Sequence, residues 1–137
     1  MAQFYLLSVL TNCIAGFALA SDFLGDKIAF LAPWKDIRSQ KNVIILIGAA
    51  TAIVGFVKLF VLSPNETVPL AGDLLPALVG LLLGGILLYE GLKARIEGKA
   101  EKLEKVTTAV LTYRVPIGIV GVAAGFLHFL LPGAPLI

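Results

Sequence analysis

The stretch VIILIGAATAIVGFVKLFVL (43–62) decides the fold, because it is long and apolar enough to cross a lipid bilayer. A helix of roughly 17–25 mostly apolar residues covers a hydrocarbon core of about 30 Å. Three further runs fall within this window or at its edge: FYLLSVLTNCIAGFALA (4–20), LLPALVGLLLGGILLYEGL (74–92) and VPIGIVGVAAGFLHFLL (115–131). Because hydrocarbon offers no partner for an open backbone, we expect an all-α integral membrane protein with four transmembrane helices.

The composition favours the same class. The chain of 137 residues is 58% hydrophobic and only 15% charged, and its mean hydropathy is +0.96, whereas a soluble domain is nearer to half apolar and a quarter charged. We therefore expect a single membrane domain over 1–137. The Ala18-Leu19-Ala20 triplet resembles the end of a secretory signal, but no basic residue precedes the run, so we expect the first helix to be retained.

The charges of the connecting segments predict the orientation. The segments 21–42 and 93–114 together hold ten Lys and Arg residues, whereas the segment 63–73 holds none. Positively charged loops stay on the cytoplasmic side of a membrane. We therefore expect 21–42 and 93–114 to be cytoplasmic, and the linker 63–73 and both termini to be extracytoplasmic, in a bacterial inner (plasma) membrane.

The two halves of the chain resemble each other. At an offset of 68 residues, Gly16 matches Gly84 and Asp22 matches Glu90; at an offset of 70, Gly48 matches Gly118 and Lys58 matches His128. Shared leucine content explains matches between apolar residues, but these residues are rarer in apolar helices. The self-similarity favours a tandem repeat of two-helix hairpins, 4–62 and 74–131. Successive hairpins run in the same direction, so the repeats would be parallel.

Small residues occupy one stripe of each predicted helix. Residues at i, i+3, i+7 and i+10 share a helix face, and such faces either pack closely against another helix or line a narrow path. Both interpretations stay open at this point. The stripe consists of Gly48, Thr51 and Gly55 in the second helix, Gly118, Gly121 and Gly125 in the fourth, Asn12 and Gly16 in the first, and Gly80 and Gly84 in the third.

Polar residues mark the two ends of the predicted bundle. At the outer end, Lys58 either snorkels to the headgroups or forms an outer mouth together with His128, with Asp73 as an acidic partner of either base. At the inner end, we expect Asp22 and Glu90 to be interface charges, Glu90 paired with Lys93 of its own helix and Asp22 with Lys27 or another loop base. An ion or proton site is the alternative. In mid-membrane, Asn12 needs a partner such as a backbone carbonyl.

The first cytoplasmic segment mixes bases with large apolar residues in KIAFLAPWKDIRSQK (27–41). This mixture predicts a short interfacial segment interrupted at Pro33, with Trp34 at the level of the headgroups. Because basic segments attract anionic headgroups, we expect anionic lipid as a partner of both basic loops.

Catalytic chemistry is not predicted. The chain has one His and one Cys, so no nucleophile–base–acid set, no Cys/His metal cluster and no haem-ligating His pair can be assembled. We therefore expect neither an enzyme nor a cofactor, metal or nucleic-acid partner. One hypothesis is a channel- or transporter-like homo-oligomer for a small solute, with the bases favouring an anion. The alternative is a non-catalytic accessory subunit of a larger membrane complex, or a lipid-binding scaffold.

Overall fold

The computed structural model describes residues 2–60, 74–96 and 102–131, and these form helices joined by short connections. Four of the helices are long and apolar enough to span a membrane, so the prediction of an all-helical protein with four such helices is confirmed. Asp73 and the linker 63–73 lie outside the described residues. The elements are α1 (Ala2–Lys27), the 3-10 helix η1 (Ala29–Leu31), α2 (Pro33–Ser39), α3 (Lys41–Phe60), α4 (Leu74–Ile96) and α5 (Lys102–Leu130).

Two helices continue well past the apolar runs that predicted them. Helix α1 has 26 residues and α5 has 29, which correspond to about 39 and 44 Å at a rise of 1.5 Å per residue. A bilayer core is about 30 Å thick. Most of the excess lies in the basic segments 21–42 and 93–114, whose described residues are therefore largely helical rather than open loops.

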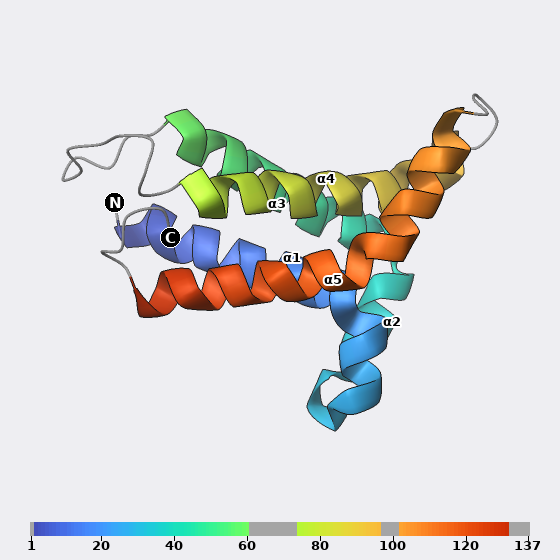
Figure 1. The fold of residues 1–137 in the computed structure, drawn as a ribbon, viewed down its shortest axis with the longest axis horizontal. Coiled ribbons are helices and arrows are strands. Elements are labelled where there is room, and N and C mark those ends of the chain that lie inside the picture. Colours follow the sequence, from blue (N-terminus) through green and yellow to red (C-terminus); the bar gives the residue numbers. More distant parts are fainter. Residues whose placement is uncertain (1, 61–73, 97–101, 132–137) are drawn as a thin grey trace.

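The four long helices alternate in direction, so α1 and α4 run one way and α3 and α5 the other (Figure 1). The most extensive contacts join α1 to α5 and α3 to α4, with smaller contacts of α1 on α3 and α4 and of α5 on α4. Each of the two large contacts therefore joins a helix of one predicted hairpin to a helix of the other. The hairpins interlock instead of forming two separate halves.

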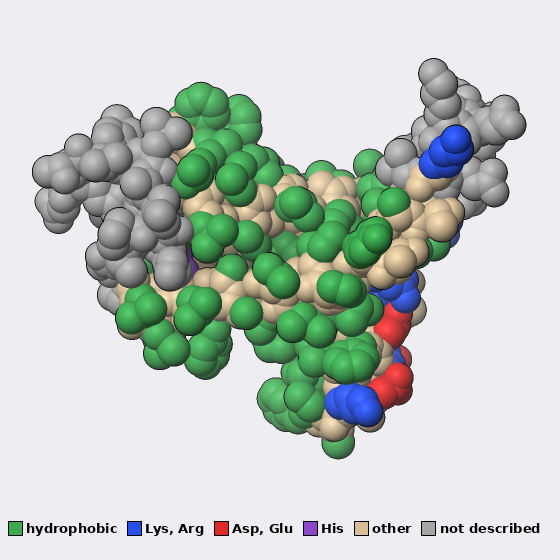
Figure 2. Space-filling model, in the orientation of Figure 1, with side chains coloured by type: hydrophobic (Ala, Val, Ile, Leu, Met, Phe, Trp, Pro, Cys, Tyr) green, Lys and Arg blue, Asp and Glu red, His purple; other side chains and the backbone are tan. Residues whose placement is uncertain are grey.

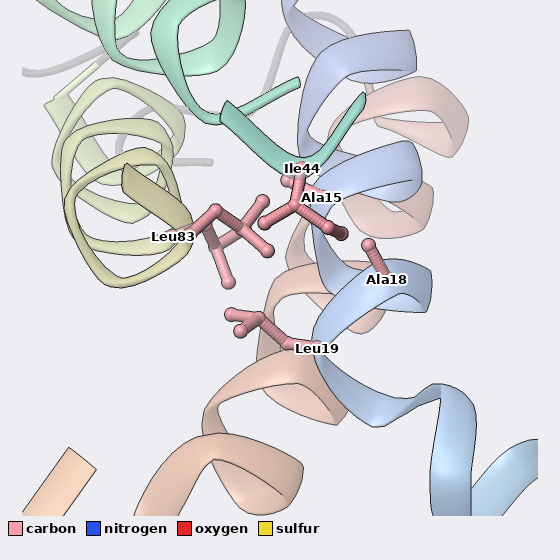
Figure 3. Close-up of a cluster of buried hydrophobic side chains, with 6 residues drawn as sticks. Ala15, Ala18, Leu19, Ile44 and Leu83 are labelled. Atoms are coloured by element: carbon pink, nitrogen blue, oxygen red, sulfur yellow. The ribbon is translucent and has the colours of Figure 1, made fainter. Parts of the chain in front are cut away.

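A layer of apolar side chains fills the centre of the bundle (Figure 3). Leu19, Leu83 and Leu87 are fully buried in it, and partly buried isoleucines and a valine surround the layer. The buried cluster consists of Ala15, Ala18, Leu19, Ile44, Leu83 and Leu87. Since alanine, glycine and small polar residues occupy many of the other inward positions, the helices pack around a thin core.

The outer surface is also apolar. Hydrophobic side chains cover the visible face of the long helices (Figure 2), and Leu46, Ile53 and Phe60 are each more than 60% exposed. A soluble monomer rarely exposes a continuous apolar surface of this extent. The distribution is compatible with a membrane protein.

Local sequence explains where the chain leaves the bundle. Ile28 has an extended backbone (φ −128°, ψ 106°), which ends the run of α1 before η1. Pro33 is the first residue of α2, where its missing N–H costs no hydrogen bond. Helix α5 changes direction along its length (Figure 1), and Pro116 lies inside it. A proline removes one helical hydrogen bond and is the usual cause of such a bend.

Candidate functional site

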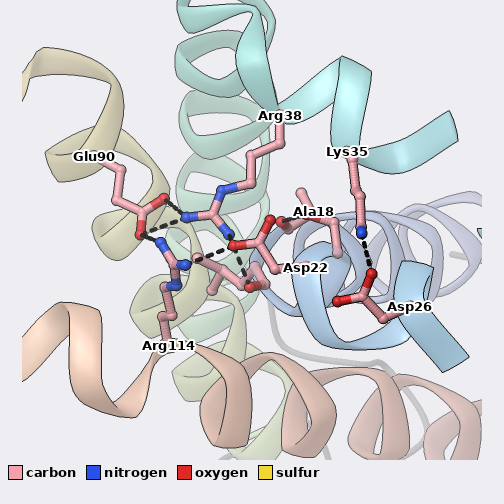
Figure 4. Close-up of polar contacts among 9 residues, drawn as sticks. Ala18, Asp22, Asp26, Lys35, Arg38, Glu90 and Arg114 are labelled. Atoms are coloured by element: carbon pink, nitrogen blue, oxygen red, sulfur yellow. Dashed lines mark hydrogen bonds and ion pairs between the residues drawn. The ribbon is translucent and has the colours of Figure 1, made fainter. Parts of the chain in front are cut away.

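Four charged side chains meet where α1, α2, α4 and α5 converge, at the end of the bundle opposite the N-terminus (Figure 4). The Arg38 guanidinium donates to Asp22 at 3.0 Å and to both Glu90 carboxylate oxygens at 3.0 and 3.2 Å. Arg114 donates to Asp22 at 2.5 Å, and its second nitrogen lies 3.8 Å from Glu90. We call Asp22, Arg38, Glu90 and Arg114 the inner charge network, and this end of the bundle the inner end, after the orientation that the loop charges predict.

The inner charge network balances two carboxylates with two guanidinium groups. The side chains of Arg38 and Glu90 are each 13% exposed, that of Arg114 is 24% exposed, and Asp22 is about half exposed. Arginine suits this position because its planar fork holds two carboxylates at once. Arg38 comes from α2 and Arg114 from α5, just before Pro116. The network therefore fixes the two elements that turn away from the bundle.

Sequence reasoning placed both carboxylates at the inner end but did not identify the arginines. We expected Glu90 to pair with Lys93 one turn along its own helix, and Asp22 with Lys27 or another loop base. The ion pairs that the structure gives both acids are with Arg38 and Arg114. The sequence offered ten loop bases and no feature that distinguishes these two.

Lys58 and His128, matched by the sequence repeat, lie side by side at the other end of the bundle. The Lys58 Nζ and His128 Nε2 atoms are 3.2 Å apart, and the two residues are 8% and 2% exposed. The Lys58 side chain therefore points towards His128. Asp73, the expected acidic partner, lies outside the described residues.

Tyr5, which sequence reasoning missed, lies beside these two residues, and we call Tyr5, Lys58 and His128 the outer cluster. Its ring centroid lies 4.6 Å from that of His128 and 5.7 Å from the Lys58 Nζ atom. Its hydroxyl group donates a hydrogen bond to the His128 carbonyl oxygen. A tyrosine near a helix end is common at membrane interfaces, so the sequence carried no signal that set this one apart.

Two polar side chains in the middle of the bundle bond to backbone carbonyls. The Asn12 amide donates to the Pro76 carbonyl oxygen of α4 at 3.0 Å. The Thr51 hydroxyl donates to the Ile47 carbonyl at 2.8 Å and reaches the Thr11 carbonyl at 3.4 Å. Each side chain thus has a hydrogen-bond partner within the bundle, which is how polar groups usually persist between apolar helices.

The glycine stripes of α3 and α4 face each other. A methyl group added to Gly84 would lie 2.7 Å from the Gly48 carbonyl oxygen and 2.6 Å from the Ala52 nitrogen. Two turns along α3 towards Lys58, a methyl group on Gly55 would lie 2.8 Å from the Ala77 carbonyl oxygen. These distances leave no room for a side chain. We call the contact of Gly48, Gly55, Gly80 and Gly84 the α3–α4 seam.

Helices α1 and α5 meet in the same register. A methyl group on Gly16 would lie 2.6 Å from the Gly118 carbonyl oxygen, and one on Gly118 would lie 2.7 Å from that of Gly16. We call the contact of Gly16, Gly118 and Gly125 the α1–α5 seam. Gly16 and Gly84 are matched by the first repeat offset, and Gly118 and Gly48 by the second. The sequence-matched glycines therefore occupy corresponding places in the two seams.

Gly121, the remaining glycine of the predicted stripe, faces the apolar layer. A methyl group there would lie 2.6 Å from a Leu83 methyl carbon. Every stripe residue thus lies against a neighbouring helix or the central layer, whereas the inner charge network and the Lys58–His128 pair lie at the two ends.

The fold and these contacts define a class: an all-helical bundle with four helices compatible with membrane spans, a charged cluster at each end and glycine contacts between its helices. Residues 1–128 match the model of a protein family of unknown function, and the chain belongs to that family. No curated protein and no solved structure matches the chain.

Proposed function

We propose that the four long helices cross a bacterial inner membrane as two parallel hairpins that arose by duplication. The equivalent glycine contacts of the two seams support the duplication, and the distribution of loop charges supports an orientation with both termini outside. Alkaline phosphatase fused to the C-terminus tests the orientation, since the enzyme folds only outside the cytoplasm. An active fusion agrees with it, and an inactive fusion of an inserted chain contradicts it.

The function that the geometry supports best is a non-catalytic membrane scaffold, acting as an accessory subunit or lipid-binding platform. One observation carries this proposal: the glycine faces, which a path would need as its walls, lie within 3 Å of neighbouring backbone at Gly16, Gly48, Gly55, Gly84 and Gly118 once a methyl group is added. Backbones that approach this closely associate tightly in lipid. The glycines therefore serve to close the bundle.

In such a scaffold, the inner charge network holds the helices of the cytoplasmic side in place. Arg38 holds α2 and Arg114 holds α5 to the same two carboxylates. Breaking a largely buried ion pair by removing one partner is costly, so both elements keep a defined direction relative to the bundle. A platform of this kind presents fixed cytoplasmic elements to anionic lipid and to a larger membrane partner.

Flux into proteoliposomes tests the scaffold proposal. Purified chain is reconstituted, and entry of chloride, nitrate, phosphate, potassium and protons is followed, with a known pore as positive control. We expect no flux above protein-free vesicles. In cells, a photo-crosslinking residue at Tyr113, which is 60% exposed on α5, should capture one partner in stoichiometric amount. Flux of any of these ions, abolished by Lys58→Ala, would contradict the proposal.

Solute transport is the second candidate, and the outer cluster is the observation that favours it. Two basic side chains that converge at a buried position near one end could hold an anionic solute. Since one four-helix unit encloses little space, transport would require a homo-oligomer. This candidate predicts anion flux that depends on both Lys58 and His128, and on the oligomer, which crosslinking in the membrane would reveal.

A further inference from the structure

The segment that links α1 to α2 stands away from the bundle axis at the cytoplasmic end proposed above. It comprises the last turns of α1 from Phe23, the 3-10 helix η1 and the start of α2 up to Lys35, and we call residues 23–35 the foot. In Figure 1 it projects to one side of the four long helices. An element that leaves a membrane bundle sideways at this level runs along the bilayer surface.

The foot is a folded unit. The Lys35 ammonium group forms an ion pair with the Asp26 carboxylate, and Leu31 is buried. The Trp34 ring packs on Phe17 of α1, with the ring centroids 5.8 Å apart. Gly25 allows α2 to approach α1, because a methyl group there would lie 2.9 Å from the Lys35 side chain. The foot therefore presents a defined surface.

That surface has an apolar side and a charged side. Phe30 is 86% exposed, the highest value of any large hydrophobic residue in the described part of the chain, and Phe23 and Ile28 are each 46% exposed. Figure 2 shows the hydrophobic side chains of the projection on the side that faces back along the bundle, and its charged side chains on the side that faces away from it. The apolar side is thus turned towards the level of the bilayer.

We propose that the foot lies in the inner leaflet at the boundary between headgroups and acyl chains, with Phe30, Ile28 and Phe23 inserted. Helix α1 supports this depth: at about 39 Å it is longer than the bilayer core, so its last turns reach the headgroup level. Amphipathic segments at this boundary bury an apolar face about 5–10 Å deep and leave their charges in water. Lys27, exposed on the last turn of α1, suits contact with headgroup phosphates.

Trp34 makes the foot directly measurable, because it is the only tryptophan in the chain. The full chain is reconstituted in vesicles whose lipids carry bromine either near the ester group or near the terminal methyl. We expect Trp34 emission to be quenched more strongly by the shallow bromines than by the deep ones, and to be shielded from acrylamide. Trp34 emission that is quenched by acrylamide and not by either brominated lipid would overturn the inference. It would indicate that the foot is exposed to water or contacts a protein partner.

The variant Phe30→Ser sharpens the test, since Phe30 makes little contact within the chain. It should shift Trp34 emission to longer wavelength and weaken the shallow quenching. The matched control is Phe60→Ser, at a residue that is 69% exposed on α3, and it should leave Trp34 unchanged. Equal spectra for the Phe30→Ser and Phe60→Ser chains would also overturn the inference.

This inference rests on the proposal that the long helices cross the bilayer, and the two fail differently. If the helices do not cross it, alkaline extraction releases the chain from the vesicles. If the helices cross the bilayer but the foot lies outside it, the chain resists extraction and acrylamide quenches Trp34 emission.

Discussion

The α3–α4 and α1–α5 seams bring their glycines together in the same register, but the helices are less closely packed at the outer level of the α1–α5 seam. In the α3–α4 seam, a methyl group on Gly55 would lie 2.8 Å from the Ala77 carbonyl oxygen and 2.9 Å from the Leu81 nitrogen. At the corresponding place in the α1–α5 seam, a methyl group on Gly125 would lie 3.3 Å from the Val9 carbonyl oxygen, and the nearest atom is the Cys13 sulfur at 2.7 Å.

Both seams therefore use the same close glycine contact at the inner level, and only the α1–α5 seam is looser at the outer level. At the inner level both seams bring glycine against glycine, so neither tolerates a side chain. At the outer level a flexible thiol separates α1 from α5, in the region where Tyr5 reaches the His128 carbonyl. The outer end of the α1–α5 seam therefore has room to adjust, and that of the α3–α4 seam has none.

The largest effect is expected from bulky residues at the shared inner level. Gly48→Leu and Gly118→Leu each force a side chain into the opposing backbone, and each should cost about 3 kcal/mol or more of unfolding free energy. Unfolding by SDS in mixed micelles, followed by circular dichroism, measures both. Similar losses would strengthen the equivalence of the seams, whereas tolerance of either substitution would break it.

A smaller loss is expected at the inner charge network. Arg38→Met leaves Glu90 and Asp22 short of a partner, and should cost about 2 kcal/mol because Arg38 and Glu90 are mostly buried. The control is Lys35→Met, which removes an ion pair with a 71% exposed carboxylate and should cost less than about 1 kcal/mol. The same SDS titration compares them, and equal losses would show that the network does not brace the bundle.

Alanine substitutions at the outer level should destabilise the two seams by modestly different amounts. Gly55→Ala meets backbone and should cost about 1–2 kcal/mol. Gly125→Ala meets the Cys13 thiol, which can rotate aside, and should cost less than about 1 kcal/mol. Adding Cys13→Ala should then recover part of that loss. A larger loss for Gly125→Ala than for Gly55→Ala would contradict the stated difference between the seams.

The number of long apolar helices could be predicted from the sequence, because lipid permits few backbone arrangements and the apolar runs are separate. The full lengths of α1 and α5 could not, since both helices continue into segments rich in bases. The glycine stripes also identified the contact faces. The stripes do not identify which helix packs on each face. By spacing alone, the glycine face of α3 fits α1, α4 or α5 equally well. The observed partner, α4, depends on the packing of all four helices together.

The polar residues of the two end clusters also divide into those that the sequence identified and those that it did not. Asp22, Glu90, Lys58 and His128 were recognisable because a charged or ionisable side chain at a helix end is rare in apolar sequence. Arg38 and Arg114 were not, since they belong to segments rich in bases and only the turn of α2 and the bend of α5 bring them to the carboxylates. Long-range geometry, rather than local pattern, selects them.

Alanine at two adjacent glycines of α4 tests most directly that the stripes are closed seams. A methyl group on Gly84 would lie 2.6 Å from the Ala52 nitrogen, whereas one on Gly85 meets nothing within 4 Å. Alanine favours a helix over glycine by up to about 1 kcal/mol. We therefore predict that Gly84→Ala lowers the unfolding free energy in SDS titration while Gly85→Ala leaves it unchanged or raises it. Equal stability of the two variants would mean that Gly84 faces open space, and would contradict the closed bundle.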